Sequence, residues 1–224
     1  MKIFKDFLFI IPARKGSKGI KNKNIINIKK KSLIEYTFKT LNKIPNNRKY
    51  VLTDCNKVKR IASKYKISTD YIRTKNLSQD STLLIENLCH FDKFINNKLK
   101  FKHYVILQPT SPLRNFEDII KSIDKYLKNK SESLFSISPS LEHPSESIFF
   151  KKNKMYYFYK SSSSLRQNYK NSFFINGAIY IFNKKLLKNK KIISNKKHIT
   201  FKMPKIRSVD LDDIQDLEIA RKLI

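Results

Sequence analysis

Hydrophobic residues along this chain follow two alternating patterns. Short continuous apolar runs, such as 7–11 and 103–107, are typical of strands that are buried on both faces. Between them, apolar residues recur with the spacing of one helix face, as at Leu84, Leu88 and Phe91. We predict strands at 7–11, 50–53, 69–72, 103–107, 133–137 and 173–182, and helices at 32–43, 56–66, 81–96, 116–128 and 214–224.

The alternation of strands and helices predicts an α/β fold with a mostly parallel sheet and helices on both faces. The length of 224 residues suits one domain, 1–224, with a core of useful size. In such sheets, ligands bind beyond the carboxyl ends of the strands. The loop 12–24 and the turn 108–114 both follow predicted strands, so we expect both at the ligand-binding edge.

Residues 139–174 interrupt the alternation. They contain Pro139, a run of serines at 161–164 and a stretch of aromatic residues and lysines at 149–159. Two interpretations are open: the aromatic rings stack on RNA bases beside lysines, or the segment is an excursion that packs against a second subunit. We favour the second interpretation because Tyr156 and its neighbours are too apolar to remain in water.

The segment 12–24 has the features of a phosphate-binding loop. It follows an apolar strand and contains Gly16 and Gly19, two of only three glycines in the chain. Glycine permits a close approach of backbone N–H groups and positive φ angles, which suit a triphosphate. The glycine spacing matches neither the P-loop nor the dinucleotide-binding fingerprint, and a solvated basic turn is the alternative. The loop cations are Arg14, Lys15, Lys18, Lys21 and Lys23.

Carboxylates gather near the end of the chain. If 207–213 is a strand, Asp210 and Asp212 point to the same side, because side chains alternate along a strand. Two carboxylates on one face suit Mg²⁺, which also takes phosphate oxygens from a substrate. Helix capping by Asp212 or Asp213 explains the same residues. Both roles are compatible if Asp210 and Asp212 bind the metal and Asp213 caps the helix.

The net charge of +30 does not by itself predict a nucleic-acid-binding protein. Only 8 of the 48 Lys and Arg residues are arginine, and lysine is spread from end to end, whereas a nucleic-acid site concentrates its charge on one face. Cys55 and Cys89 form neither a disulfide framework nor a metal-ligand cluster. The first strand begins close to Met1 and no apolar run has the length of a membrane span, so we expect a cytoplasmic protein without membrane contact.

Four segments, in order, resemble the CMP-sialic acid synthetases, or acylneuraminate cytidylyltransferases. They are IIPARKGSKGIKNKNI (10–25), LQPTSPLR (107–114), INGAIYIF (175–182) and RSVDLDDIQDLEIA (207–220). The resemblance implies a Rossmann-like nucleotidyltransferase fold and a homodimer built through a dimerisation and sugar-site excursion at 139–174. It also implies a Mg²⁺-dependent reaction in which the anomeric hydroxyl of a free nonulosonic acid attacks the α-phosphate of CTP. The products are a CMP-sugar and pyrophosphate.

The resemblance also implies roles for individual residues. The implied catalytic residues are Arg14 and Lys23, which stabilise charge on the α-phosphate and departing pyrophosphate, and Asp212, which accepts the hydroxyl proton. The implied metal ligands are Asp210 and Asp212. Nucleotide contacts are implied for Arg14, Lys18, Gly19, Lys23, Asn24, Arg73 and Asp80. Sugar contacts are implied for Gln108, Thr110, Ser111, Arg166, Gln167, Asn176 and Tyr180, with Arg166 as the cation for the sugar carboxylate.

The resemblance leaves the sugar open. Enzymes that activate legionaminic or pseudaminic acid share these motifs, and Phe174 stands where sialic acid enzymes often carry an arginine. A cytidylyltransferase for Kdo and a basic nucleic-acid-binding protein are the alternative functions.

Overall fold

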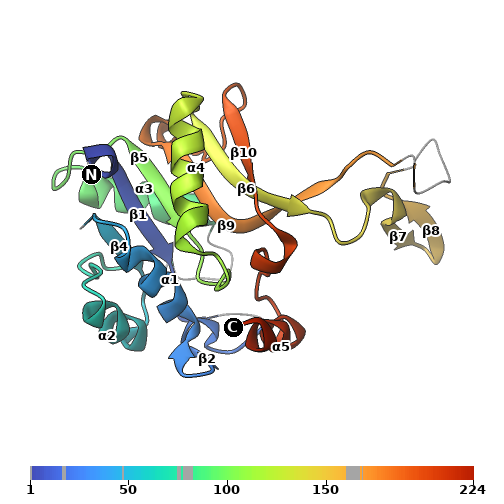
Figure 1. Ribbon diagram of the computed structural model, residues 1–224, viewed down its shortest axis with the longest axis horizontal. Coiled ribbons are helices and arrows are strands. Elements are labelled where there is room, and N and C mark those ends of the chain that lie inside the picture. The colour runs from blue at the N-terminus through green and yellow to red at the C-terminus, as the bar shows by residue number, and fades with distance from the viewer. Residues whose placement is uncertain are drawn as a thin grey trace.

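The computed structural model describes residues 2–16, 19–46, 48–74, 77, 83–159, 167 and 169–224. A six-stranded sheet with the strand order β10-β6-β9-β5-β1-β4 forms its centre (Figure 1). The strands are β1 (Phe7–Pro12), β4 (Lys49–Leu52), β5 (His103–Leu107), β6 (Ser133–Pro139), β9 (Phe173–Asn183) and β10 (His198–Lys202). Strand β9 runs antiparallel to its neighbours β5 and β6, and the other pairs in this sheet are parallel. The predicted mostly parallel sheet is therefore confirmed.

Helices cover both faces of this sheet, as predicted (Figure 1). They are α1 (Leu33–Asn42), α2 (Asn56–Lys64) and α4 (Phe116–Lys128) on one face and α3 (Leu84–Ile95) on the other. Strand β1 lies between the two layers: Phe7, Phe9 and Ile11 pack on the α1 side. Leu8 and Ile10 pack on the α3 side. A strand that is buried on both faces has apolar residues at every position. This is why the apolar run at 7–11 predicted β1 correctly.

The C-terminal helix docks on the segment that follows β1. Helix α5 (Ile214–Leu223) contacts a small antiparallel hairpin of β2 (Asn27–Ile28) and β3 (Lys31–Ser32). A small separate core joins these elements, formed by Ile20, Ile28, Leu33, Leu211, Leu217 and Ala220. Apolar packing thus brings the end of the chain against the loop after β1 (Figure 1).

An arm leaves the body of the molecule between β6 and β9 and ends in a hairpin of β7 (Ile148–Lys151) and β8 (Lys154–Tyr157) (Figure 1). This arm corresponds to the predicted excursion at 139–174. Its aromatic residues are exposed in the single chain, with Phe150 at 70% and Phe158 at 71%. The predicted role of the arm in dimerisation stays a prediction.

Short 3₁₀ helices complete the description of the backbone. They are η1 (Lys2–Asp6), η2 (Lys23–Ile25), η4 (Pro144–Glu146), η6 (Lys184–Asn189) and η7 (Lys205–Arg207). None of the helices in the described part of the chain combines the length and the apolar character that a membrane crossing requires.

The predicted strand at 69–72 is wrong. Ser68 forms an isolated bridge with Tyr50, and the residues after it are irregular. Tyr71 is nevertheless fully buried, with its ring edge-on to Phe91 at 5.1 Å between centroids. Tyr71 therefore packs against α3 without extending the sheet, while Ile72 is 73% exposed. Strands β2, β3, β7, β8 and β10 were not predicted, because none of them forms a buried apolar run.

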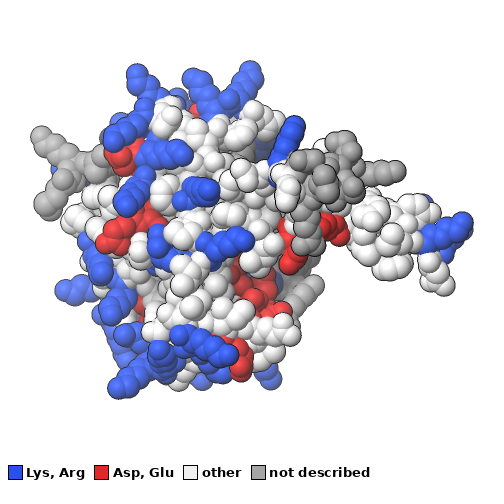
Figure 2. Space-filling model, turned by 45° about the vertical axis from the view of Figure 1, so that its right-hand side comes forward, with Lys and Arg blue, Asp and Glu red and all other residues white. Residues whose placement is uncertain are grey.

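Lys and Arg are scattered over the visible face of the molecule, with Asp and Glu between them (Figure 2). The charge does not gather in one patch on this face. This distribution agrees with a chain-wide excess of lysine and gives no outline of a nucleic-acid groove on this face.

Candidate active site

The loops that were predicted to bind ligand lie at one edge of the sheet. Strand β1 pairs in parallel with both β4 and β5, so the segments that follow these strands emerge together. Strand β9 runs the other way, and its register places Ile179 beside Leu107, the last residue of β5. Asn176 and Gly177 therefore lie beyond the carboxyl end of β5. The fold thus brings the segments 13–16, 19–24, 108–114 and 175–180 to the same edge.

The loop after β1 is tied to its neighbours by hydrogen bonds. The Lys15 backbone N–H donates to Asp54 Oδ1 at 2.7 Å, and Asn24 Nδ2 donates to the Arg14 carbonyl oxygen at 2.9 Å. Burial lowers the pKa of Arg73, as does the charge of Arg14, while Asp54 opposes the decrease. These interactions place Arg14, Asn24 and Arg73 in one neighbourhood, as a shared nucleotide site requires. Asp54 also belongs to this neighbourhood but was not among the predicted site residues.

The glycines of this loop have different surroundings. A Cβ atom added to Gly19 would lie 2.0 Å from the carbonyl oxygen of Asp212, so only glycine fits there. A Cβ atom at Gly16 would meet nothing within 4 Å. A positive φ is found instead at Gly177, at 70°. The close approach at Gly19 is to the protein's own C-terminal segment.

Lys23 joins the loop to residues 210–212, which we call the acidic segment. Its Nζ donates to the Leu211 carbonyl oxygen at 2.5 Å and to Asp212 Oδ1 at 3.0 Å. The Lys23 side chain is only 12% exposed, whereas that of Asp212 is 79% exposed. Lys23 therefore holds its ammonium group at the inner end of the segment, and the Asp212 carboxylate remains open to solvent.

Asp210 lies in a polar corner with Gln108 and Gly177. A Cβ atom at Gly177 would be 3.0 Å from Gln108 Oε1 and 3.2 Å from Asp210 Oδ2, so these groups converge. Burial raises the pKa of Asp210, and Asp212 adds to the rise while Thr110 and Lys23 oppose it. Burial and the charge of Asp210 also raise the pKa of Tyr180.

Two oxygens in this corner are buried without hydrogen bonds. Asp210 Oδ1 and Thr110 Oγ1 find no hydrogen-bond partner of good geometry among the described residues. The Thr110 hydroxyl is near enough to lower the pKa of Asp210, but the two side chains are not well aligned. Buried polar atoms without partners cost free energy, so they mark positions where a ligand can complete the structure.

The carboxylates are not carried by a strand, and that prediction is wrong. Residues 208–212 have no regular secondary structure, and they follow η7. The predicted cap is confirmed for Asp213, whose carboxylate accepts hydrogen bonds from the N–H groups of Gln215 at 2.8 Å and Asp216 at 3.0 Å. Asp210 is partly buried, while Asp212 is exposed.

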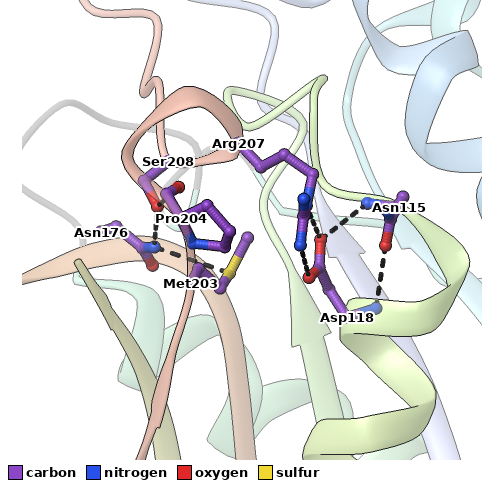
Figure 3. Close-up of polar contacts among 7 residues, drawn as sticks. All are labelled: Asn115, Asp118, Asn176, Met203, Pro204, Arg207 and Ser208. Atoms are coloured by element: carbon purple, nitrogen blue, oxygen red, sulfur yellow. Dashed lines mark hydrogen bonds and ion pairs between the residues drawn. The ribbon is translucent and has the colours of Figure 1, made fainter.

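Asn176 belongs to the framework of the site. Its Nδ2 donates to Ser208 Oγ at 2.9 Å (Figure 3). Its Oδ1 accepts from Ser136 Oγ at 2.5 Å and from the Ala178 N–H at 3.2 Å. The residue is 1% exposed. Because this buried amide is occupied by the protein itself, the geometry does not support the predicted contact between the Asn176 side chain and a sugar.

The other predicted residues divide into described and undescribed positions. Ser111 is buried at 1% exposure, and its hydroxyl has no partner among the described residues. Gln167 is exposed on the segment that returns from the arm. Lys18, Asp80 and Arg166 lie outside the described residues.

The carboxylates of this edge suit a metal ion that is shared with a substrate. Within the described ranges, no three His, Cys, Asp or Glu residues form a metal-binding group. Mg²⁺ binds through one or two carboxylates together with substrate phosphates and water, so a complete protein cage is not required. Asp210, with its unpartnered buried Oδ1, and the exposed Asp212 fit this kind of site.

Comparison with known protein families identifies the chain. The family model described as cytidylyltransferase matches residues 8–223. The chain belongs to the cytidylyltransferase family. It is therefore a nucleotidyltransferase, and the resemblance of the four motifs to this family is confirmed.

Individual relatives support the same assignment. A pseudaminic acid cytidylyltransferase of Campylobacter jejuni is 32% identical, with 96% of this chain and 95% of that protein covered. An N-acylneuraminate cytidylyltransferase of Escherichia coli is 30% identical over 94% of this chain and 50% of its own length. A CMP-N,N'-diacetyllegionaminic acid synthase of Legionella pneumophila is 28% identical, with 97% of this chain and 95% of that protein covered.

Solved structures confirm the fold. A CMP:2-keto-3-deoxy-manno-octonic acid synthetase complexed with CTP superposes with a TM-score of 0.70 at 16% identity, covering 97% of both chains. The 4-diphosphocytidyl-2C-methyl-D-erythritol synthase of Anaerococcus prevotii gives a TM-score of 0.65 at 15% identity, also covering 97% of both chains. The fold is that of the Rossmann-like nucleotidyltransferases.

Proposed function

We propose that this cytidylyltransferase transfers CMP from CTP to the anomeric hydroxyl of a free nonulosonic acid and releases pyrophosphate. One observation carries the proposal: the basic loop after β1 and the acidic segment at 210–212 meet beside Gln108 and Gly177. A site for this reaction needs both halves, one for the triphosphate and one for the attacking hydroxyl and its metal ion. The names of the relatives supply the class of sugar.

The loop residues bind and neutralise the triphosphate in this proposal. Phosphoryl transfer asks the protein mainly for positioning and for stabilising negative charge. Arg14 and Lys23 supply positive charge to the α-phosphate and the departing pyrophosphate, and Asn24 and Arg73 hold the nucleotide. Support comes from the proximity of Arg73 to Arg14 and from the position of Lys23 beside Leu211 and Asp212.

The acidic segment prepares the sugar hydroxyl. Asp210 and Asp212 would hold Mg²⁺, which supplies Lewis-acid activation of a hydroxyl group and neutralises phosphate charge when it is bound. Asp212 accepts the hydroxyl proton and, being exposed, passes it to solvent. Gln108, Thr110 and Tyr180 orient the sugar from the same corner; Gln108 and Tyr180 lie close to Asp210.

Pseudaminic acid is the first sugar to test. Two Campylobacter jejuni relatives with that substrate in their names are 32% and 31% identical, with 95% of each covered. Relatives named for N-acylneuraminic and legionaminic acid follow at 30% and 28%. The Kdo alternative is less well supported, because that enzyme matches at 16% identity and supports the fold alone.

We also propose a homodimer formed through the arm. Exposed aromatic residues on β7 and β8 form an apolar surface that a monomer would leave in water. A second copy of the chain is the partner, because the segment 139–174 was predicted to pack against a second subunit.

The test is a product assay with purified protein, CTP and Mg²⁺. Pseudaminic, legionaminic, N-acetylneuraminic acid and Kdo are supplied separately, and the CMP-sugar is detected by mass. We expect a CMP-nonulosonic acid with pyrophosphate in equal amount. A folded protein that does not bind CTP, but binds RNA at physiological salt, would instead support the nucleic-acid-binding alternative.

A further inference from the structure

The acidic segment lacks regular structure of its own, so its position depends on individual contacts. In its middle, the Leu211 N–H donates to the Thr110 carbonyl oxygen at 2.9 Å, and the Leu211 side chain is fully buried. Arg207 and Ser208 lie three and two residues before Asp210 and make two polar connections to the body of the protein (Figure 3).

The first connection is an ion pair between Arg207 and Asp118. Arg207 Nε donates to Asp118 Oδ2, and its second nitrogen donates to Oδ1, both at 2.9 Å. The Asp118 side chain is 3% exposed and lies in the first turn of α4, where its Oδ2 also accepts from the Asn115 N–H at 3.1 Å. A bidentate guanidinium–carboxylate pair fixes orientation as well as distance.

The second connection runs through Ser208 to β9. The Ser208 hydroxyl donates to the Pro204 carbonyl oxygen at 2.8 Å and accepts from Asn176 Nδ2 at 2.9 Å (Figure 3). Asn176 directly precedes Gly177, the residue whose backbone faces Gln108 and Asp210. This contact therefore joins the start of the acidic segment to the strand that forms the polar corner.

The two attachment points are themselves rigidly connected. Arg114, which is 2% exposed, donates from Nη1 to the carbonyl oxygens of Ala178 at 2.7 Å and Gln108 at 3.1 Å. Arg114 directly precedes Asn115, the cap of α4, and Ala178 follows Gly177 on β9. The start of α4 and the start of β9 thus form one frame around Gln108.

We propose that Arg207 and Ser208 are positioning residues that hold Asp210 against Gln108 and Gly177, through Asp118 and Asn176 respectively. Neither residue contacts substrate; each acts through the placement of the acidic segment. The proposal rests on the proposed function only for its effect on the Mg²⁺ requirement and the rate of the reaction. The placement of the acidic segment can be measured without substrate.

The test compares Arg207→Lys, Ser208→Ala and the control Lys205→Met. Arg207→Lys keeps the charge that balances Asp118 but loses the bidentate geometry. Ser208→Ala removes the acceptor for Asn176 and keeps the backbone. Lys205 is exposed in the same 3₁₀ turn, so its substitution removes a charge without removing either connection.

The first readout is amide hydrogen exchange of the substrate-free protein. The Leu211 N–H is the reporter, because its partner, the Thr110 carbonyl, lies across the site. We expect about tenfold faster exchange at Leu211 in Arg207→Lys and Ser208→Ala, with exchange in α3 and β5 unchanged. If exchange in α3 and β5 becomes faster by the same factor as exchange at Leu211, Arg207 and Ser208 contribute to overall stability and the proposal is overturned.

The second readout is the Mg²⁺ concentration that gives half-maximal rate. We expect it to rise about tenfold in both variants, as is usual when the groups that orient metal ligands are changed, with the KM for CTP at saturating Mg²⁺ within about twofold. Wild-type exchange and wild-type metal requirement in both variants would overturn the proposal. If the protein makes no CMP-sugar, the proposed function fails, and the exchange of Leu211 still decides the positioning role.

Discussion

At the scale of single residues, the site depends on close contacts between segments that are far apart in the sequence. Gly19 lies against the backbone of Asp212, Lys23 bonds to Leu211 and Asp212, and Gly177 faces Asp210. Each contact leaves little room for a different side chain. Substitutions at these positions therefore test the geometry directly.

The first prediction compares the two loop glycines. Gly19→Ala places a methyl group 2.0 Å from the Asp212 carbonyl oxygen, so the acidic segment must move away from the loop. We expect a loss of about 1–3 kcal/mol in the free energy of unfolding and a large fall in kcat/KM. In Gly16→Ala the added methyl group has no neighbour within 4 Å, so this variant should have the same free energy of unfolding as the wild type. Equal denaturant midpoints for the two variants would contradict the close approach of Gly19 to Asp212.

The second prediction concerns Lys23. Lys23→Met removes the ammonium group between the loop and the acidic segment, and we expect kcat to fall by about 10²–10³ with a smaller change in the KM for CTP. The neighbouring exposed Lys21 provides the control, since Lys21→Met should keep wild-type kinetics. If both variants show the same kinetics, Lys23 is one of the solvated lysines and has no special role.

The third prediction follows from the raised pKa of Asp210. Because burial raises this pKa above the ordinary value of 3.8, the folded state binds the proton more tightly than the unfolded state. The stabilising contribution of Asp210 is complete below that value and is lost as the pH rises through the raised pKa. Asp210→Asn has no such loss, so in metal-free buffer its stability relative to wild type should increase between about pH 4 and pH 7.

Thermal unfolding of both proteins across this pH range checks the third prediction. If Asp210 holds the proposed Mg²⁺, the same variant should also lose about 100-fold or more in activity. A stability difference that does not change with pH would show that Asp210 titrates like a solvent-exposed carboxylate.

The sequence predicted which residues gather at this edge better than it predicted the contacts of each side chain. Lys23, Asp210 and Gln108 come together as the motifs implied. The amide of Asn176 is used inside the protein instead. Whether a polar side chain faces a ligand or the interior depends on contacts with distant residues such as Ser136 and Ser208, and no local pattern contains that information.

At the scale of elements, the buried strands and amphipathic helices were predictable because their periodicity reflects burial. Strand β1 and helix α4 lie where the apolar pattern placed them. The segment 69–72 shows the limit of this reasoning, since its buried Tyr71 packs on α3 and forms no ladder. Strand β10 has no continuous buried run, because its residues are partly or largely exposed.

The fourth prediction concerns the hairpin of β7 and β8. If the arm forms the dimer contact, introducing charge into its apolar surface should separate the subunits, because a buried unpaired carboxylate is costly. We expect the double variant Phe150→Asp/Phe158→Asp to be a monomer by light scattering and the wild type a dimer. Ile219→Asp, which places a carboxylate on the exposed side of α5, should remain a dimer. A wild-type monomer at micromolar concentration would contradict the proposal.

At the scale of the whole molecule, the fold and family follow from the order of the motifs along the chain. The carboxyl ends of β1, β4 and β5 and the start of β9 meet at one edge, and the C-terminal segment closes that edge. The net charge of +30 is a poor guide by comparison, because its lysines are scattered over the face shown in Figure 2. The positions of Asp210 and Asp212 say more about the function than the total charge does.

The central claim is that this edge joins CTP to a nonulosonic acid, and a competition assay tests it most directly. Limiting CTP and Mg²⁺ are given to the wild type and to Asp210→Asn with equal amounts of pseudaminic, legionaminic, N-acetylneuraminic acid and Kdo, and the CMP-sugars are quantified by mass. We predict that one CMP-nonulosonic acid dominates with the wild type, matches the released pyrophosphate and nearly disappears with Asp210→Asn. Dominance of CMP-Kdo, or equal yields from the two proteins, would contradict the account.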